Sequence, residues 1–246
     1  MAELRTALAA VLLFVLSEGT VAQSSPPADV TQSPYGKDDG TVPATLSFST
    51  AGGIEEAISF PDTQGDISVV LICGLQFVEI DRVPAWNNTC FGRSGNTGAF
   101  EQAFREAMPS LTVSGGRVNG TRRRLWIPYS VEFTKRGEDE RIRLYSNYGT
   151  EISRYGRYYS APQRILPKRA PNVFRTCRID SPGEVVWVTA NITADGMPED
   201  VRILAEVSDA CRKRLEITFV RSSFIPAFHE GRPVPAVFSE PFYVLP

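Results

Sequence analysis

The chain has 246 residues, and its 26 basic and 28 acidic side chains give a formal net charge of −2. This near-neutral balance favours no particular class of partner. A single histidine and four cysteines without a CxxC pair exclude the usual zinc sites, so we expect no metal and no cofactor.

The first element in the chain is a candidate signal peptide, residues 1–22. Residues 6–16 form an apolar run that is too short to cross a bilayer, and small residues, Thr20 and Ala22, follow it. We therefore predict export with cleavage between Ala22 and Gln23; the alternative is an uncleaved membrane anchor. Residues 23–40 are rich in Ser, Pro, Asp and Gly, which predicts a disordered spacer.

The next segment, residues 41–134, reads as one folded unit. Residues 67–73 are a β-rich apolar run, and a second extended stretch ends near Cys90. Residues 99–108 carry apolar side chains at helical spacing, and residues 125–133 have the composition of a final strand. The predicted order is strand, strand, helix, strand.

Residues 162–246 repeat this order. Residues 185–193 predict a strand, Asp195-Gly196 is a hairpin turn signal, and residues 201–207 alternate as a second strand. Ser208 is a helix N-cap for residues up to about Arg221, and a last strand runs through Tyr243. The predicted fold class is α+β, with two tandem ββαβ units, each a three-stranded antiparallel sheet with one helix packed on a face.

The four cysteines form an even set in a chain that we expect to be exported, which favours disulfides. Each unit contains two of them, so we predict the pairs Cys73–Cys90 and Cys177–Cys211. Each closure contributes about 3 kcal/mol in the chain-entropy model.

Between the units, residues 135–161 are predicted to be a connector. It opens with a charge run that favours an exposed loop. From Arg141 to Arg178 the sequence has nine basic residues, one acid (Glu151) and five tyrosines. Export argues against nucleic acid as the partner. Two readings stay open, a contact with an anionic envelope surface and a plain connector whose tyrosines pack on the sheets.

Catalytic patterns are missing from the sequence. His229 is the sole histidine and precedes a turn, and there is no Gly-x-Ser-x-Gly elbow and no phosphate-binding glycine spacing. We therefore expect a non-enzymatic protein.

The C-terminal motif carries a family resemblance. Phe224-x-Pro226-Ala227, Gly231-Arg232-Pro233-Val234 and Pro241-Phe242 resemble the ending of the TonB C-terminal domain family. The first unit, with its Gly-Arg-Val and Ile-Pro-Tyr ending, resembles a more divergent member. The prolines confine the pairing of the last strand and predict a sheet edge.

The resemblance implies a soluble periplasmic binding protein that accepts an extended segment by strand addition. The implied partner is an outer-membrane transporter segment of TonB-box type or another envelope protein. The candidate partner-binding residues lie on the last strand: Val234, Ala236, Val237, Phe238, Phe242, Tyr243 and Val244. The alternative is a scaffold module whose sheets pair with each other or with a second copy. The spacer is far shorter than the family's, which leaves energy transduction outside what the resemblance implies.

Overall fold

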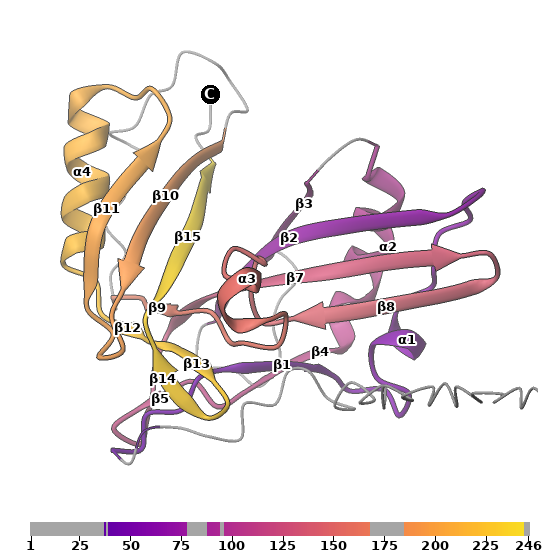
Figure 1. Ribbon diagram of the computed structural model, residues 1–246, viewed down its shortest axis with the longest axis horizontal. Helices are drawn as coiled ribbons and strands as arrows, with labels where there is room; N and C mark the ends of the chain where they lie inside the picture. Colours follow the sequence, from indigo (N-terminus) through magenta and orange to yellow (C-terminus); the bar gives the residue numbers. More distant parts are fainter. Residues whose placement is uncertain (1–36, 38, 78–87, 94–95, 168–184, 244–246) are drawn as a thin grey trace, which may run out of the picture.

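The computed structural model describes residues 37, 39–77, 88–93, 96–167 and 185–243. It is an α+β fold with several antiparallel sheets, in agreement with the predicted class (Figure 1). The expected signal peptide and nearly all of the expected spacer lie outside the described residues. Among the helices of the described part, none has the length and apolar character needed to cross a membrane.

The larger sheet has six strands in the order β12-β9-β7-β2-β3, with β8 also paired to β7. Its strands are β2 (Ile67–Phe77), β3 (Asn88–Gly92), β7 (Leu125–Arg136), β8 (Asp139–Tyr145), β9 (Gln163–Ile165) and β12 (Phe224–Ile225). β2 and β7 form the centre and pair from Ile67↔Lys135 to Phe77↔Leu125.

The three-stranded sheet predicted for the first half is therefore wrong. β7 continues past the expected end, and the charge run after it is a hairpin around Gly137, whose φ of 58° suits glycine. The returning strand, β8, pairs with the outer edge of β7 from Ser130↔Tyr145 to Arg136↔Asp139. On the same edge, β9 pairs with Leu125 and Trp126. The expected connector therefore contributes one strand, β8, to this sheet, and the start of the predicted second unit contributes β9.

One face of the central strands is packed by α2 (Gly98–Ala107). This helix matches the predicted segment, and Phe100, Phe104 and Ala107 are its buried side chains. They contact the inward side chains of β2 and β7, and smaller elements complete the layer. The buried strand residues are Leu71, Cys73, Leu75, Leu125, Ile127, Tyr129, Val131 and Phe133. The smaller elements are β1 (Thr45–Phe48), β4 (Leu111–Ser114), α1 (Ile54–Ala57), η2 (Met108–Ser110), β5 (Arg117–Val118) and β6 (Thr121–Arg122).

The smaller sheet has three antiparallel strands in the order β11-β10-β15. They are β10 (Val185–Ile192), β11 (Pro198–Leu204) and β15 (Ala236–Tyr243), and α4 (Asp209–Val220) packs on one face (Figure 1). Ser208 caps α4 by accepting a hydrogen bond from the Cys211 backbone N–H, as predicted. Gly196 has φ 82° in the β10–β11 hairpin, and a Cβ there would lie 2.2 Å from the Phe224 carbonyl oxygen. Glycine is therefore required at this turn.

The remaining elements are short. They are α3 (Ile152–Tyr155), which lies between β15 and the larger sheet in Figure 1, and a two-stranded hairpin of β13 (Ala227–His229) and β14 (Arg232–Val234).

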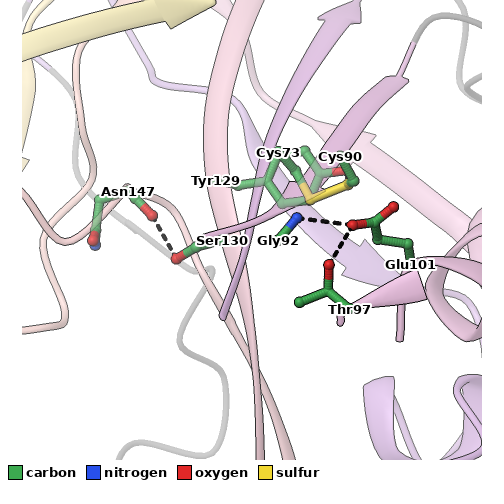
Figure 2. Close-up of a disulfide and its surroundings, with 8 residues drawn as sticks. All are labelled: Cys73, Cys90, Gly92, Thr97, Glu101, Tyr129, Ser130 and Asn147. Atoms are coloured by element: carbon green, nitrogen blue, oxygen red, sulfur yellow. Dashed lines mark hydrogen bonds between the residues drawn. A yellow bond between two sulfur atoms is a disulfide. The ribbon is translucent and has the colours of Figure 1, made fainter. Parts of the chain in front are cut away.

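The predicted disulfide Cys73–Cys90 is confirmed (Figure 2). The two cysteines lie directly opposite each other on β2 and β3, and the bond closes a loop of 17 residues. Nearby, Glu101 on α2 accepts hydrogen bonds from the Gly92 backbone N–H and from the Thr97 hydroxyl, which fixes the helix start against β3. Cys211 on α4 is fully buried and also disulfide-bonded. Its predicted partner, Cys177, lies outside the described residues.

The two units are joined by shared packing. β12 comes from the second half of the chain but pairs with β9 in the larger sheet. Ile225 and Phe228 are buried in the core of the first unit. Trp126, from the first unit, packs against the core of the second unit. Its ring lies over Gly74, where a Cβ would come within 2.0 Å of the ring. The units therefore form one packed assembly.

Candidate functional site

The predicted binding strand, β15, lies at an edge of the smaller sheet, as its prolines predict. It pairs antiparallel with β10 from Val185↔Tyr243 to Ile192↔Ala236 without interruption. Within the described part of the chain no strand pairs with its other side.

The position of Pro241 determines which backbone groups point to this outer side. Opposite residues in an antiparallel pair alternate between exchanging two hydrogen bonds and exchanging none. Pro241 lies opposite Trp187 and has no N–H, so these two residues form a pair that exchanges no hydrogen bonds. Ser239 and Val237 lie two and four residues before Pro241, so they also form pairs without hydrogen bonds. Their N–H and C=O groups therefore point away from β10.

Three of the candidate residues, Ala236, Phe238 and Phe242, belong to the other class. Their backbone groups face β10, and their side chains are buried. The Phe238 ring packs against Phe224, with centroids 4.9 Å apart, and against Phe219. Phe238 and Phe242 belong to the core under α4, and Ala236 belongs to a separate small cluster with Tyr159. A role for these three residues in partner binding stays a prediction.

The other candidates divide by position. Val234 is half-buried on β14, outside the smaller sheet. Tyr243 ends β15. It lies two residues after Pro241, so its backbone N–H and C=O groups also point away from β10. Val244 lies outside the described residues. Val237 is thus the candidate whose backbone groups face outward in the middle of the site.

The outer edge of β15 is contacted by residues that the sequence did not mark as site residues. The Glu151 carboxylate accepts a hydrogen bond from the Val237 N–H at 3.1 Å, and the Tyr155 hydroxyl donates to the Pro235 carbonyl at 2.6 Å. Both side chains come from α3 and the residue that precedes it. Further along the strand, Ser239 and Pro241 are buried.

The opposite edge of the sheet, β11, has features that prevent strand pairing. Its register with β10 shifts between Thr189 and Asn191, which marks a bulge. Asp200 has φ 50°, and Pro198 and Arg202 flank it. Bulges, prolines and charges protect edges from pairing, so β15 is the better candidate edge.

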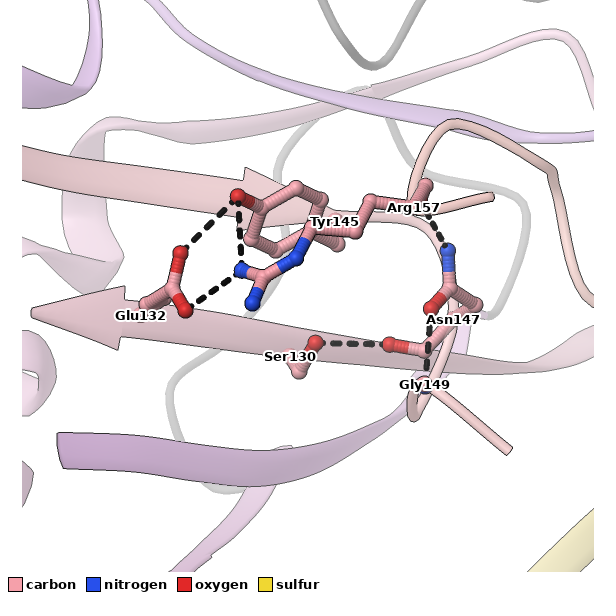
Figure 3. Close-up of polar contacts among 6 residues, drawn as sticks. All are labelled: Ser130, Glu132, Tyr145, Asn147, Gly149 and Arg157. Carbon is pink, nitrogen blue, oxygen red and sulfur yellow. Dashed lines mark hydrogen bonds and ion pairs between the residues drawn. The ribbon is translucent and has the colours of Figure 1, made fainter. Parts of the chain in front are cut away.

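A polar cluster lies on the larger sheet beside α3 (Figure 3). The Tyr145 hydroxyl donates to Glu132 at 2.9 Å, and the Arg157 guanidinium donates to the same carboxylate at 2.5 Å. Burial, with Glu132 adding to it, raises the pKa of Tyr145, whereas the bond from Arg157 lowers it. Both oxygens of Glu132 are thus occupied, and the cluster fixes the segment after β8 to the sheet.

These contacts also bear on the basic segment from Arg141 to Arg178. Arg141 pairs with Asp139, Arg157 with Glu132 and Arg164 with Glu240, so internal ion pairs use several of its charges. Three of its tyrosines are buried on the sheets, namely Tyr145, Tyr148 and Tyr159. Residues 168–178 lie outside the described part.

A buried ion pair connects the units. Arg164 on β9 donates to both oxygens of Glu240 on β15, at 2.6 and 2.5 Å, and both side chains are less than 10% exposed. The guanidinium lies 5.2 Å from the centroid of the Phe219 ring. Burial raises the pKa of Glu240, and Arg164 opposes that rise.

Potential metal ligands lie scattered over the described residues. No group of three or more potential metal ligands occurs among them. His229, expected in an exposed turn, is half-buried on β13, with its ring centroid 5.3 Å from that of Tyr155.

No protein-family model, curated protein or solved structure matches the chain. The resemblance to the TonB C-terminal domain family therefore rests on the motif residues alone.

Proposed function

We propose that the protein is a non-enzymatic, exported binding protein that takes up an extended segment of a partner along the outer edge of β15. The observation that carries the proposal is the outward direction of the Val237 and Ser239 backbone groups, which follows from the place of Pro241 opposite Trp187. A peptide that adds to such an edge gains backbone hydrogen bonds in register with the strand. The partner is an envelope protein or a TonB-box-like segment of an outer-membrane transporter, met in the periplasm.

We further propose that the chain carries two tandem TonB-like units. Support comes from a shared strand order, since the first strand of each unit lies between the second and the last, as β3-β2-β7 and β11-β10-β15. The last strands also share a proline in register: Pro128 lies opposite Gly74 and Pro241 opposite Trp187. The first unit adds β8 and β9 to this plan.

The Val237→Pro variant tests the binding edge. It removes an outward N–H and leaves the hydrogen bonds between β15 and β10 in place, so we expect about a fivefold loss of affinity for a labelled TonB-box peptide. Val237→Ala is the matched control, because it keeps the N–H, and should stay within about twofold of the wild type. The titration uses the mature chain, since Glu151 and the β7 partner of β9 lie outside a fragment of residues 162–246. Equal loss in both variants would place the recognition in the side chain and contradict strand addition.

The scaffold alternative has two observations in its favour. β12 already pairs with the larger sheet, and Arg164–Glu240 holds the smaller sheet to it. Sedimentation equilibrium distinguishes the free binder from a scaffold made of two copies, because a scaffold that consumes the edge of β15 in a second copy is a dimer, whereas the free binder is a monomer.

A further inference from the structure

We infer that the α3 segment, Glu151 to Tyr155, is an intramolecular latch that occupies the β15 edge in place of a partner strand and has to release it before a peptide binds. The inference rests on the proposed function. The proposed partner is an extended backbone segment.

The chemistry of the two contacts is that of a pairing strand. A strand added to β15 would accept from the outward N–H groups and donate to the outward carbonyls. The Glu151 carboxylate takes the acceptor role at Val237, and the Tyr155 hydroxyl takes the donor role at Pro235. Because Pro235 and Val237 are two residues apart, their backbone groups point to the same side, away from β10. Two side chains from one short segment therefore fill two successive positions of the edge.

The backbone that carries these side chains is held independently of β15. The Asn147 side-chain amide donates to the Arg157 and Tyr159 carbonyls, both at 2.8 Å, and its oxygen accepts from the Gly149 N–H. Ser130 on β7 donates to the Asn147 carbonyl at 2.7 Å, so the segment is fastened to the larger sheet at both ends (Figure 3). Release therefore requires that the two side chains leave the edge, and that the Tyr155 ring separates from the small cluster to which Ala236 of β15 belongs.

The Tyr155 ring also has contacts that do not involve the edge. Its centroid lies 5.7 Å from that of Tyr159, 5.3 Å from that of His229 and 5.0 Å from the Arg154 guanidinium carbon. Replacement by phenylalanine keeps these ring contacts and removes only the hydroxyl that bonds to Pro235. Tyr155→Phe is therefore a conservative test of the latch.

The apparent affinity for the peptide equals the affinity of the open edge multiplied by the fraction of molecules in which the edge is open. The latch lowers this fraction. A net hydrogen bond corresponds to about a fivefold change in an equilibrium constant. We expect Glu151→Ala and Tyr155→Phe each to raise the affinity for the labelled TonB-box peptide about fivefold, and the double variant about 25-fold. Ser153→Ala is the matched control, because Ser153 is exposed on the same helix and has no part in the two bonds.

Amide hydrogen exchange at Val237 provides a readout that needs no peptide. In the mature chain, Glu151→Ala should accelerate it about fivefold, and Ser153→Ala should leave it unchanged. If exchange is unchanged in Glu151→Ala while the wild type binds peptide, the latch is wrong and the proposed function stands. If exchange accelerates but neither the wild type nor the double variant binds peptide at millimolar concentration, the edge is not a peptide site and both proposals fail.

Discussion

Replacing Arg164 with alanine is expected to lower the free energy of unfolding by about 3–5 kcal/mol at pH 7. The change leaves the Glu240 carboxylate, which is 3% exposed, without its bidentate partner and removes a cation from the Phe219 ring. Because the pair connects β9 with β15, the loss should affect both units. Chemical denaturation of the variant and the wild type measures the difference.

The loss of unfolding free energy in Arg164→Ala should also depend on pH. Without the guanidinium, burial alone acts on Glu240 and raises its pKa further above the ordinary value of 4.5. A carboxyl with a raised pKa in the folded state opposes folding above that pKa, and the penalty disappears as pH falls toward the value in the unfolded chain. The difference from wild type should therefore be smaller at pH 4 than at pH 7.

Arg202→Ala is the control for this experiment, because Arg202 also forms an ion pair, with Asp200, but is exposed. Its stability should match the wild type within error at both pH values. The double change Arg164→Met with Glu240→Leu should recover most of the loss, since it removes both buried charges together. An Arg164→Ala variant as stable as the wild type, or equally destabilised at pH 4 and pH 7, would contradict a buried ion pair at this interface.

Phe238→Ala should be comparably destabilising, with a loss of about 3–5 kcal/mol. Phe238 is fully buried between Phe219 on α4 and Phe224, so truncation leaves a cavity in the core of the second unit. From the sequence alone, Phe238 is a candidate partner-binding residue. Because the side chain is buried, we expect the substitution to lower the stability of the fold. Thermal and chemical unfolding of the variant provide the measurement.

The matched control for Phe238→Ala is Val220→Ala, because Val220 follows Phe219 on α4 but is 61% exposed. It should cost less than about 0.5 kcal/mol. A Phe238→Ala variant with normal stability and weaker peptide binding would restore the interpretation of Phe238 as a contact residue.

Local signals predicted the second unit well. Ser208 before an apolar stripe marked the start of α4, and Asp195-Gly196 marked the β10–β11 turn. Each signal depends on neighbours within a few residues, and the physical cause acts over the same range. The Cys73–Cys90 pair was predictable for the same reason, because both residues lie on adjacent strands of one hairpin.

The first sheet was predicted less well, because its extra strands either begin with charged residues or are very short. β8 begins with Asp139, Glu140 and Arg141, which are exposed and read as a loop, and only its pairing with β7 makes it a strand. β9 and β12 have three and two residues, too few for periodicity to be detected.

At the candidate site, proline chemistry predicted the edge position of β15, but the latch had no signal in the sequence. Glu151 and Tyr155 reach the strand across separations of 86 and 80 residues. Glu151 stood out only as the sole acid of a basic segment. Its role depends on where the larger sheet places α3, which local patterns do not specify.

Residue-resolved amide exchange with and without the labelled TonB-box peptide tests the central claim most directly. We predict that binding slows exchange at Ser239, whose N–H points outward, and leaves exchange at Phe238 and Glu240 unchanged, since their N–H groups already bond to β10. At Val237 the peptide replaces the Glu151 carboxylate, so protection there should persist even in Glu151→Ala. Uniform slowing along β15, or slowing on β11 instead, would contradict strand addition at this edge.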